Sequence, residues 1–596
     1  MPTYKAPLED MRFVLHELFD STSRAVLPGN TDFSRDLIDS ILDHASRLTE
    51  DVLFPLNQQG DLEGCVLENG RVRTPSGFKK AYKIFCDGGW TAMSASPDWG
   101  GQAVPIPVAM MVDEMLCSSN VAFALYPGLS RGAYVALSHV GGEDLKEIYL
   151  PNLVSGKWSA TMCLTEAHCG TDLGMLQTRA VPKEDGSYGI SGDKIFISAG
   201  EHDLTENIIH LVLARLPDAP AGVRGISMFL VPKFLPKKDG TPGPRNGVQC
   251  TALEHKMGIH GSATCTMNFD NATGWLLGEP NKGLAGMFTM MNVERVAVGM
   301  QGLGIAEVAY QNAVLYARER LQGRSLRGPK APTKPADPII VHPDIRRMLL
   351  TMRAYIEGCR AVACWVGNEL EVLQKSDDID AKLMAEDFSA LMTPVVKALF
   401  TDLGFEIASL AVQVYGGHGY IRDHGVEQFL RDARISMLYE GTNGVQALDL
   451  VTRKLPHDRG RLLSRFFGPV VGFIEQQSQN RVLEPFLPQL RRAVEHLQSA
   501  TSFIAENAPS NHDEAGAASA EYLRLFGLVA LAFVWTRMAS VSAPRIEEPG
   551  HRGKFHRAKV RTAQFFMDRL LPQTGALLAA IQSGSKIMME FEDTAF

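Results

Sequence analysis

A single carboxylate at a glycine-containing turn is the residue of this sequence best suited to acid–base chemistry. Glu440 is followed by Gly441 and Thr442, and it separates a charged segment at Arg431–Arg434 from an apolar helical pattern that begins at Val445. A Glu at such a turn can lie in an apolar pocket, which raises its pKa, while free backbone N–H groups bind a neighbouring oxygen. These features suit proton abstraction from the carbon beside a carbonyl group, because the base needs a raised pKa and the enolate needs N–H donors.

Three further segments contain residues that suit a bound cofactor. Met162–Asp172 supplies small polar residues, Ala317–Arg324 supplies cations, and Ala411–Tyr420 supplies glycines. In this order, and together with the Glu440 turn, they resemble the corresponding segments of the acyl-CoA dehydrogenases. The resemblance covers roughly residues 35–455. The remaining C-terminal part looks like the extension carried by the larger, bacterial-type members of that family.

The resemblance implies a reaction and a cofactor. The reaction is FAD-dependent α,β-dehydrogenation of a fatty acyl-CoA thioester to the trans-2-enoyl-CoA in fatty-acid β-oxidation. Glu440 abstracts the α-proton, and the flavin accepts the β-hydride. A cofactor is required on chemical grounds as well, because no side chain accepts hydride reversibly. The sequence has no Rossmann fingerprint, since Gly416-Gly417-His418-Gly419 lacks the required spacing, so we expect FAD bound without a Rossmann fold.

The resemblance also assigns binding residues by position. The cofactor-binding positions are Met162, Leu164, Thr165, Gly170, Thr171, Phe196, Ser198, Arg320, Gln413, Gly416, Gly417 and Thr442. The substrate-binding positions are Thr171, Arg295, Glu440 and Gly441. Phe196 stands where many relatives have Trp, and a core Phe is an equal alternative. Arg320 can pair bidentately with a pyrophosphate, although an Arg in such a segment is more commonly a surface helix charge.

Several of these positions imply an oligomer. Gln413, Gly416 and Gly417 match residues that hold the FAD diphosphate from a neighbouring subunit, with Arg320 contacting the cofactor from the opposite chain. Without a cofactor, the two glycines would be a helix C-cap and turn. We therefore expect a homo-oligomer, most simply a dimer, with an electron-transferring flavoprotein as the partner that accepts the electrons.

Two carboxylates have alternative interpretations. Glu440 could be a helix N-terminal carboxylate that interacts with the helix dipole, the commoner role of a Glu beside Gly-Thr. Glu294, in Met291–Arg295, matches the helix on which some relatives carry the base, but those relatives lack Glu at the position of Glu440. We predict that Glu440 is the base and that Glu294 is a helix-start carboxylate paired with Arg295 or a nearby residue.

Other functions remain open at this point. An acyl-CoA oxidase would differ only in the access of O2 to the reduced flavin. The extended architecture also resembles the dehydrogenases of 3-(methylthio)propanoyl-CoA. A different class would be an inactive acyl-CoA-binding protein, which the presence of Glu440, Gln413 and Arg320 disfavours.

Composition limits the remaining possibilities. The chain has 596 residues, of which 45% are hydrophobic and 21% charged, so several globular domains are expected. Its net charge of −8 argues against non-specific binding of nucleic acid.

The nine cysteines include no CxxC pair, which indicates reduced intracellular thiols, a cytoplasmic location and no metal site. Cys163 and Cys169 are expected to be buried small residues. The apolar run Leu525–Trp535 is too short to cross a bilayer, so no integral membrane segment is expected.

The patterning predicts a multidomain α+β protein in four parts. Helical periodicity dominates residues 1–158, an N-terminal α-helical domain, and returns over residues 282–455, a four-helix-type catalytic domain. Between them, residues 159–281 contain short β-type runs separated by Gly, Pro, Asp and Asn, which predict a small antiparallel barrel or sandwich. The segment Pro456–Gly460 is a plausible linker to an appended helical domain at 461–596. We expect this extension to support assembly or cover the substrate, without chemistry of its own.

Overall fold

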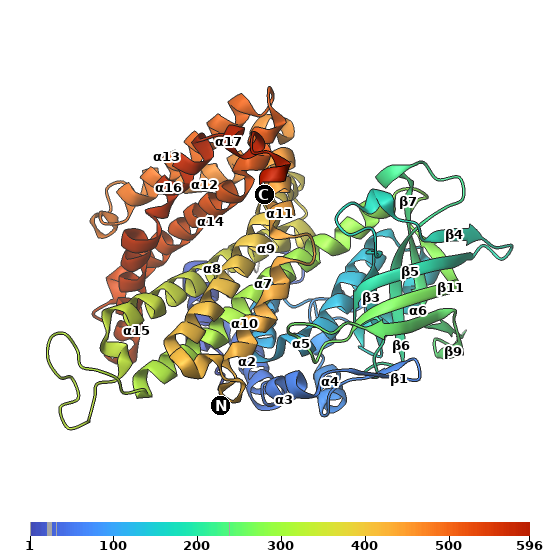
Figure 1. Ribbon diagram of the computed structural model, residues 1–596, viewed down its shortest axis with the longest axis horizontal. Helices are drawn as coiled ribbons and strands as arrows, with labels where there is room; N and C mark the ends of the chain where they lie inside the picture. Colours follow the sequence, from blue (N-terminus) through green and yellow to red (C-terminus); the bar gives the residue numbers. More distant parts are fainter. Residues whose placement is uncertain (1, 21–26, 31, 238) are drawn as a thin grey trace. The chain divides into compact units, whose positions relative to one another are not determined.

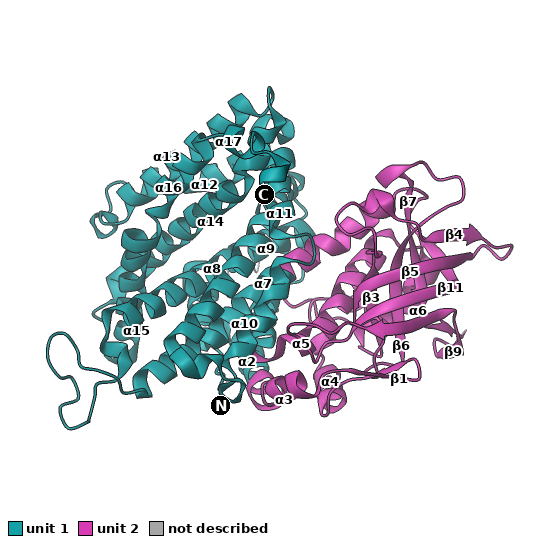
Figure 2. Cartoon of the chain, viewed as in Figure 1, with its two compact units in different colours: residues 1–46, 105–118, 298–596 teal, residues 47–104, 119–297 magenta. Residues whose placement is uncertain are grey.

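The computed structural model describes residues 2–20, 27–30, 32–237 and 239–596, and its contacts divide the chain into two compact units (Figure 2). Unit 1 comprises residues 1–46, 105–118 and 298–596, and unit 2 comprises residues 47–104 and 119–297. Two boundaries between the units fall inside long helices, α5 (Ile106–Val140) and α7 (Gly283–Glu319). The backbone of α5 leaves the helical conformation at Asn120, close to one of these boundaries.

Unit 2 contains the β-structure, drawn in green in Figure 1. Strand β11 pairs with both β5 and β7, and β5, β4, β6 and β7 follow one another in the sheet, so these five strands close into a small barrel. Strands β10 and β3 extend it, beside β11 and β6. The strands are β3 (Trp158–Cys163), β4 (Arg179–Pro182), β5 (Tyr188–Ser198), β6 (Asn207–Arg215), β7 (Ile226–Pro232), β10 (Val248–Leu253) and β11 (Thr264–Leu277).

The predicted barrel is confirmed, but its antiparallel character is only partly correct. Strand β3 runs parallel to β6, with Trp158 opposite Asn207 and Cys163 opposite Val212. The chain passes through β4 and β5 between these two strands, so no hairpin joins them. Alternation of side chains identifies a strand but contains no information on the direction of its neighbour, which is why the sequence did not predict this pairing.

The side chains of β6 show how the barrel is held in unit 2. Ile209 and Leu211 pack in one apolar cluster with residues of α5, α6 (Glu143–Val154) and the start of α7. Val212 and Ala214 belong to a second cluster built from the strands themselves. Because both faces of β6 are buried, the strand reads as a continuous apolar run, as expected of a strand covered on two sides. The smaller helices of this unit are α3 (Pro55–Glu63) and α4 (Phe78–Asp87).

Unit 1 is helical. The predicted N-terminal helices are present as α1 (Leu8–Arg12), its continuation to Leu18, and α2 (Arg35–Arg47). The long helices α8 (Pro343–Lys375) and α9 (Ile379–Tyr415) pack against each other. Pro343 opens α8 as predicted, since a proline at the first helical position sacrifices no intrahelical hydrogen bond. The shorter helices α10 (Val426–Arg434) and α11 (Asn443–Asp449) pack on α9.

The C-terminal extension shares a core with this helical bundle. It consists of α12 (Arg461–Gln476), α13 (Leu487–Asn507), α14 (His512–Ser542), α15 (Gly550–Phe565), α16 (Gln573–Gln582) and α17 (Lys586–Met589), coloured orange to red in Figure 1. Helix α14 packs against α8, α9 and α11. The ring of Trp365 on α8 lies 6.0 Å from that of Phe466 and 5.0 Å from that of Phe533, both in the extension. The extension therefore clusters with residues 298–455 in one unit, and the division into four domains stays a prediction.

Two helices are long and apolar enough to be compared with membrane spans. They are Ile106–Val140 and His512–Arg545, and 89% and 83% of their most apolar windows are buried in the structure. Core helices of globular proteins have the same composition and burial. The apolar run Leu525–Trp535 is buried throughout, as predicted from its hydrophobicity.

A buried ionic cluster joins the first helix of unit 1 to its extension. The guanidinium of Arg360 pairs with Asp10, Glu114 and Glu307. Lys559 of α15 pairs with the same Asp10. Lys559 also pairs with Glu357 at 2.7 Å, so four carboxylates face the two cations. Burial, opposed by Arg360, raises the pKa of Glu114 to about 7, so this residue can hold a shared proton near neutral pH.

Candidate active site

The turn at Glu440 contains two consecutive residues in the left-handed backbone conformation. Glu440 has φ of 58° and Gly441 has φ of 82°. Glycine adopts this conformation at little cost. For a Glu the conformation costs about 1 kcal/mol, and it persists only where neighbouring contacts fix it. Thr442 ends the turn as the N-cap of α11, with its hydroxyl accepting a hydrogen bond from the N–H of Val445 at 3.2 Å. The sequence therefore builds a strained turn that presents the half-buried Glu440.

Contacts within unit 1 fix this turn on both sides. The buried side-chain amide of Gln446 donates hydrogen bonds to the carbonyl oxygens of Glu440 and Gly441, at 3.2 and 3.3 Å. On the preceding side, the hydroxyl of Tyr439 donates to the side chain of Gln301 on α7. Glu440 precedes the N-cap rather than lying in the first turn of α11. Its geometry thus differs from that of a carboxylate placed to interact with the helix dipole.

The predicted phosphate ligands meet at one end of a helix pair in unit 1. The ring of Tyr316 on α7 stacks on that of Tyr415 on α9, with centroids 4.1 Å apart. Arg320 follows one helical turn after Tyr316, and its N–H donates to the Tyr316 carbonyl oxygen. Gly416 and Gly417 directly follow Tyr415. A methyl group added to either glycine would meet no atom within 4 Å, so packing inside the chain does not require glycine there.

The adjacency of Arg320 and Gly416 changes the expectation that these residues contact the cofactor from opposite chains. Arg320, Gln413, Gly416 and Gly417 are all exposed, and Arg320 makes no ion pair with any residue that the structure describes. Because the stacked Tyr316 and Tyr415 bring the two segments together, an anion bound there would contact both from the same chain. The geometry favours this arrangement over contacts from opposite chains.

In unit 2, the loop after β3 contains the other predicted cofactor residues. Met162 is the penultimate residue of β3, and Leu164 and Thr165 follow the strand. All three are half-buried, whereas Gly170 and Thr171 are exposed. The carbonyl oxygen of Thr165 accepts a hydrogen bond from the N–H of Ile195 on β5 at 3.0 Å. The loop is thus attached to the barrel, and it contains a tight turn in which Glu166 and Cys169 exchange two backbone hydrogen bonds.

A buried ion pair beneath this loop was not anticipated. Lys194 has no exposed surface, and its ammonium group donates to Glu166 at 2.8 Å and to the carbonyl oxygen of Leu164 at 2.9 Å. The Glu166 carboxylate also accepts from the N–H and hydroxyl groups of Thr178. Burial lowers the pKa of Lys194, while Lys194 and Thr178 outweigh burial and lower that of Glu166. The loop therefore rests on a fully hydrogen-bonded ion pair.

Phe196 is exposed by an irregularity of β5. The pairing of β5 with β11 shifts register between Lys194 and Ile197, so the strand bulges there. Phe196 has φ of 60° and is 59% exposed, an unusual combination for a large apolar residue. Phe196 is therefore no core residue within this chain, and its contact with the flavin stays a prediction. Ser198, two residues on, is half-buried and pairs with Thr264.

The prediction for Glu294 is wrong in one respect. Helix α7 begins at Gly283, so Glu294 lies about three turns inside the helix, at 3.6 residues per turn, and not at its start. Glu294 is 5% exposed and faces Gly132 on α5, where an added methyl group would lie 2.4 Å from its carboxylate. The guanidinium of the neighbouring Arg295 lies 5.6 Å from the ring of Phe288. The first turns of α7 contain glycines and no clear helical periodicity, so the sequence predicted a later start for this helix.

The cysteines near the loop are structural. Cys163 and Cys169 are both buried, as predicted, and burial raises the pKa of Cys163 to about 12. A thiol with so high a pKa is unreactive at neutral pH. Among the residues that the structure describes, no group of three His, Cys, Asp or Glu side chains is arranged to bind a metal ion.

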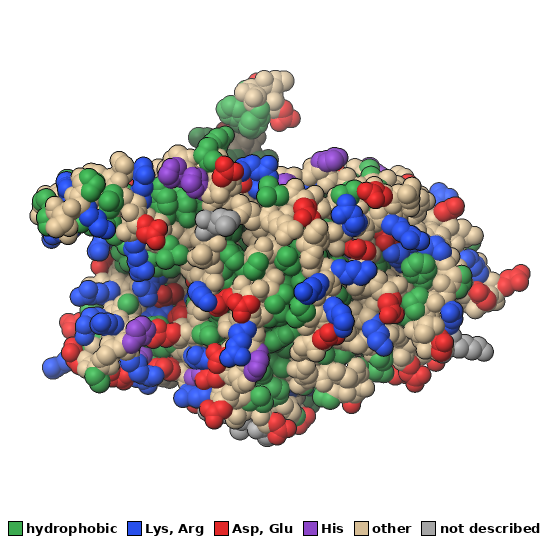
Figure 3. Space-filling model, turned by 90° about the horizontal axis from the view of Figure 1, so that it is seen from below, with side chains coloured by type: hydrophobic (Ala, Val, Ile, Leu, Met, Phe, Trp, Pro, Cys, Tyr) green, Lys and Arg blue, Asp and Glu red, His purple; other side chains and the backbone are tan. Residues whose placement is uncertain are grey.

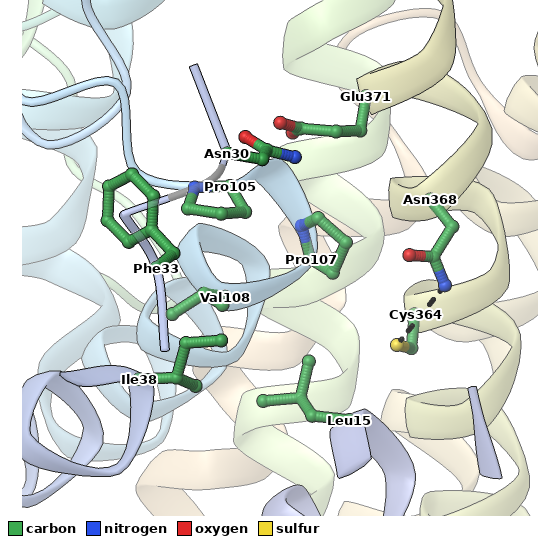
Figure 4. A pocket seen from close by; sticks show the side chains of 10 residues that line it. All are labelled: Leu15, Asn30, Phe33, Ile38, Pro105, Pro107, Val108, Cys364, Asn368 and Glu371. Carbon is green, nitrogen blue, oxygen red and sulfur yellow. Dashed lines mark hydrogen bonds between the residues drawn. The ribbon is translucent and has the colours of Figure 1, made fainter. Parts of the chain in front are cut away.

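The charges on the face drawn in Figure 3 are mixed, and a small cavity in unit 1 is lined by none of the predicted site residues. On the face drawn in Figure 3, acidic and basic side chains are interspersed without a large region of one sign. The cavity in Figure 4 lies among Asn30, Pro105, Asn368 and Glu371. Its volume of about 20 Å³ accommodates about one water molecule. No predicted site residue lines it.

The structure adds residues that the sequence did not single out. Asn443 follows the Glu440 turn and binds α9 through Lys397 and Asp402, at 2.7 Å each. Lys194 likewise joins the loop after β3 to β5. Each of these residues acts through a partner at least 28 positions away. In the sequence, each of these residues is simply a polar residue within an apolar pattern. Many surface residues have the same feature, so it does not identify a functional role.

The fold and these residues define a mainly helical protein with a β-barrel formed by the middle of the sequence and a glutamate-bearing turn. Four family models match the chain in order. They are the acyl-CoA dehydrogenase N-terminal domain at residues 40–157, the middle domain at 161–272, the C-terminal domain at 281–455, and the acetyl-CoA dehydrogenase C-terminal-like domain at 466–592. The chain belongs to the acyl-CoA dehydrogenase family, and it is therefore an oxidoreductase of the flavoprotein type.

Similar proteins of full length support this assignment. The 3-methylmercaptopropionyl-CoA dehydrogenase of Ruegeria pomeroyi is 42% identical over 96% of this chain and 97% of its own length. The broad-specificity linear acyl-CoA dehydrogenase FadE5 of Mycobacterium tuberculosis is 33% identical over 100% of both chains. An acyl-CoA dehydrogenase of Bacillus anthracis, solved in complex with FAD, has the same fold, with a TM-score of 0.72, 20% identity, and coverage of 96% of this chain and 91% of that one.

Proposed function

We propose that this protein catalyses FAD-dependent α,β-dehydrogenation of an acyl-CoA thioester, with Glu440 as the base that removes the α-proton. The observation that carries the proposal is the turn itself. A glutamate held at φ of 58° between Tyr439 and Gly441 stores strain that its neighbours must maintain, and such strain is concentrated at functional sites. Proton abstraction by a positioned side chain requires this kind of fixed presentation.

The residues present fit FAD. Phe196 offers an exposed ring at the bulge of β5, next to the loop that contains Leu164 and Thr165, as required for contact with a flat aromatic ring. Arg320 offers an exposed guanidinium beside the open backbone of Gly416, which suits a pyrophosphate. When bound, FAD supplies the acceptor for the hydride that leaves the β-carbon.

The acyl group is the open part of the proposal, and two candidates have support. A linear fatty acyl-CoA, as used in β-oxidation, agrees with the similarity to FadE5. A 3-(methylthio)propanoyl group agrees with the higher identity, 42%, to the Ruegeria protein. Both substrates have an acidic α-carbon and a β-hydrogen, so the same base serves either.

An anaerobic titration tests the function and the substrate together. Purified protein should contain a yellow flavin that bleaches on addition of its acyl-CoA, and a series of acyl lengths that includes 3-(methylthio)propanoyl-CoA identifies the preferred group. Peroxide produced in air would indicate an oxidase, whereas turnover only with an electron-transferring flavoprotein would indicate a dehydrogenase. A protein that binds acyl-CoA without any bleaching would contradict the proposal.

Assembly is part of the proposal. We expect the exposed Arg320, Gln413, Gly416 and Gly417 of one chain to contact together the cofactor of a second copy. The protein should therefore be a homodimer or a higher oligomer in solution. Light scattering of the FAD-containing protein checks this expectation. A monomer that retains stoichiometric FAD would contradict it.

A further inference from the structure

Asn443 follows the Glu440 turn, and the two ends of its side-chain amide contact groups of opposite charge. The Oδ1 atom of Asn443 accepts a hydrogen bond from the ammonium group of Lys397 at 2.7 Å. Its Nδ2 atom donates to the carboxylate of Asp402 at 2.7 Å and to the hydroxyl of Thr401 at 2.9 Å. An ammonium group only donates and a carboxylate only accepts. Only one orientation of the Asn443 amide therefore satisfies both partners.

These contacts matter because of where Asn443 lies. It is the first residue of α11, separated from Glu440 only by Gly441 and Thr442. The turn between them contains left-handed backbone at Glu440 and Gly441. Such a conformation relaxes unless both of its ends are held. Gln446 binds the carbonyl groups of the turn, and Asn443 attaches its far end to α9.

The C-terminal extension contacts the same part of α9. Arg524 of α14 donates to Glu406 at 3.0 Å, one turn after Asp402. Gly527 of α14 packs on Leu399, and an added methyl group there would lie 2.6 Å from the Leu399 side chain. Burial raises the pKa of Asp402, and the Asn443 amide and the charge of Arg524 oppose that rise. The extension and the Glu440 turn thus bind neighbouring turns of one helix in unit 1.

We infer that Asn443 and Asp402 are positioning residues for the base Glu440, and that Arg524 of the C-terminal extension supports them. The inference rests on the proposed role of Glu440, and it gives the extension a part in catalysis beyond cover or assembly. Neither Asn443 nor Asp402 reacts. They hold the turn so that the Glu440 carboxylate keeps its direction toward the α-carbon, and a displacement of about 1 Å costs on the order of a hundredfold in rate.

Exchange of the two side chains tests this inference. Asn443→Asp alone places two carboxylates at a hydrogen-bond distance, and should lower the rate of anaerobic flavin reduction by about thirtyfold or more, since like charges in contact repel strongly. Asp402→Asn alone replaces the charged acceptor by a weaker, neutral amide oxygen and should lower the rate by about tenfold, the effect of losing roughly 1.4 kcal/mol of positioning. The double variant Asn443→Asp/Asp402→Asn restores one donor facing one acceptor, and it should recover the rate to within about threefold of wild type.

Three further measurements separate positioning from general destabilisation. FAD content and KM should stay unchanged in all variants, and the kinetic isotope effect with α-deuterated acyl-CoA should increase in the two single variants, because proton removal becomes slower. Arg524→Gln should lower the rate by about threefold, since its charge acts on Asp402 without a direct bond. Asn507→Asp is the matched control, because the side chain of Asn507, at the end of α13, donates its hydrogen bond to the Phe503 carbonyl oxygen of the same helix. It should have no effect on rate.

The outcomes distinguish the inference from the proposed function. If folded, FAD-containing Asn443→Asp reduces flavin at the wild-type rate, or if the double variant is no faster than the slower single variant, Asn443 and Asp402 do not position the base. If Glu440→Gln in the wild-type background reduces flavin normally, the proposed base itself is wrong. An isotope effect on flavin reduction by wild type with α-deuterated acyl-CoA would show independently that the protein removes an α-proton.

Discussion

Two strained positions of this molecule are held by different kinds of contact. Glu440 in unit 1 and Phe196 in unit 2 are both left-handed, with φ of 58° and 60°. The turn of Glu440 is held mainly by amide hydrogen bonds, from Gln446 and Asn443. The bulge of Phe196 directly follows Lys194, which forms a buried ion pair. A neutral hydrogen bond such as those of Gln446 contributes about 1 kcal/mol, and one to a charged group, such as that of Asn443 to Asp402, contributes about 1.5–3 kcal/mol. Loss of one partner from a buried ion pair costs more, about 3–5 kcal/mol.

The comparison separates contacts that adjust activity from contacts that maintain the fold. Weak, directional hydrogen bonds around Glu440 can be altered while the bundle of unit 1 stays folded. The Lys194–Glu166 pair is part of the barrel, because it joins β5 to the loop after β3 and to Thr178 before β4. We therefore expect substitutions near Glu440 to change rates, and substitutions at Lys194 to change stability first.

The largest expected effect is on the rate and comes from the base. Glu440→Gln keeps the size of the side chain and removes its basicity, so flavin reduction by acyl-CoA should fall by roughly 10²–10⁴-fold or more. FAD content and the free energy of unfolding should stay near wild type, because Glu440 is half-buried. Stopped-flow absorbance measures the rate. Glu294→Gln is the control, and a near-normal rate in Glu440→Gln together with a large loss in Glu294→Gln would assign the base to Glu294.

The next effect is on stability and comes from the ion pair. Lys194→Met leaves the carboxylate of Glu166 buried without its cation, so the free energy of unfolding should fall by about 3–5 kcal/mol. Urea denaturation followed by circular dichroism measures the loss. Lys157→Met, at an exposed lysine of the same unit, is the control and should change stability by less than about 0.5 kcal/mol. A Lys194→Met protein as stable as this control would remove the distinction between the two regions.

These contrasts also show what the sequence predicted and why. The Glu440 turn was predictable because its residues are contiguous, and Gly441 and Thr442 indicate the turn and the N-cap locally. The partners of Lys194 and Asn443 were not, because Glu166 lies 28 positions from Lys194 and Asp402 lies 41 from Asn443. The parallel pairing of β3 and β6 was missed for the same reason. Pattern indicates which face of an element is buried, but long-range partners depend on the tertiary fold.

The buried ionic cluster around Arg360 should also control stability in unit 1. Burial raises the pKa of Glu114 to about 7, so between the ordinary pKa of a Glu and pH 7 the folded protein holds a proton that the unfolded chain has lost. The stabilisation from this proton is complete below about pH 4.5 and is lost as pH rises through about 7. In Glu114→Gln this dependence should be absent.

The measurement is a difference between two proteins. The unfolding free energy of wild type minus that of Glu114→Gln should decrease by up to roughly 3 kcal/mol between pH 4.5 and pH 8, at about 1.4 kcal/mol for each unit of pKa shift. The difference removes contributions of other groups, such as Asp10, whose pKa Lys559 and Arg360 lower against the effect of burial. A difference that stays constant over this range would show that Glu114 is ionised throughout.

The smallest expected effect compares the two strained positions directly. Asparagine tolerates the left-handed conformation better than Phe or Glu. Phe196→Asn and Glu440→Asn should therefore each raise the free energy of unfolding, by up to about 1 kcal/mol, because neither wild-type side chain is buried. The functional losses should differ. Phe196→Asn should weaken FAD retention during gel filtration, whereas Glu440→Asn should retain FAD and lose flavin reduction. If either variant is less stable than wild type, the backbone at that position stores no strain, and its conformation is simply the one that the fold prefers.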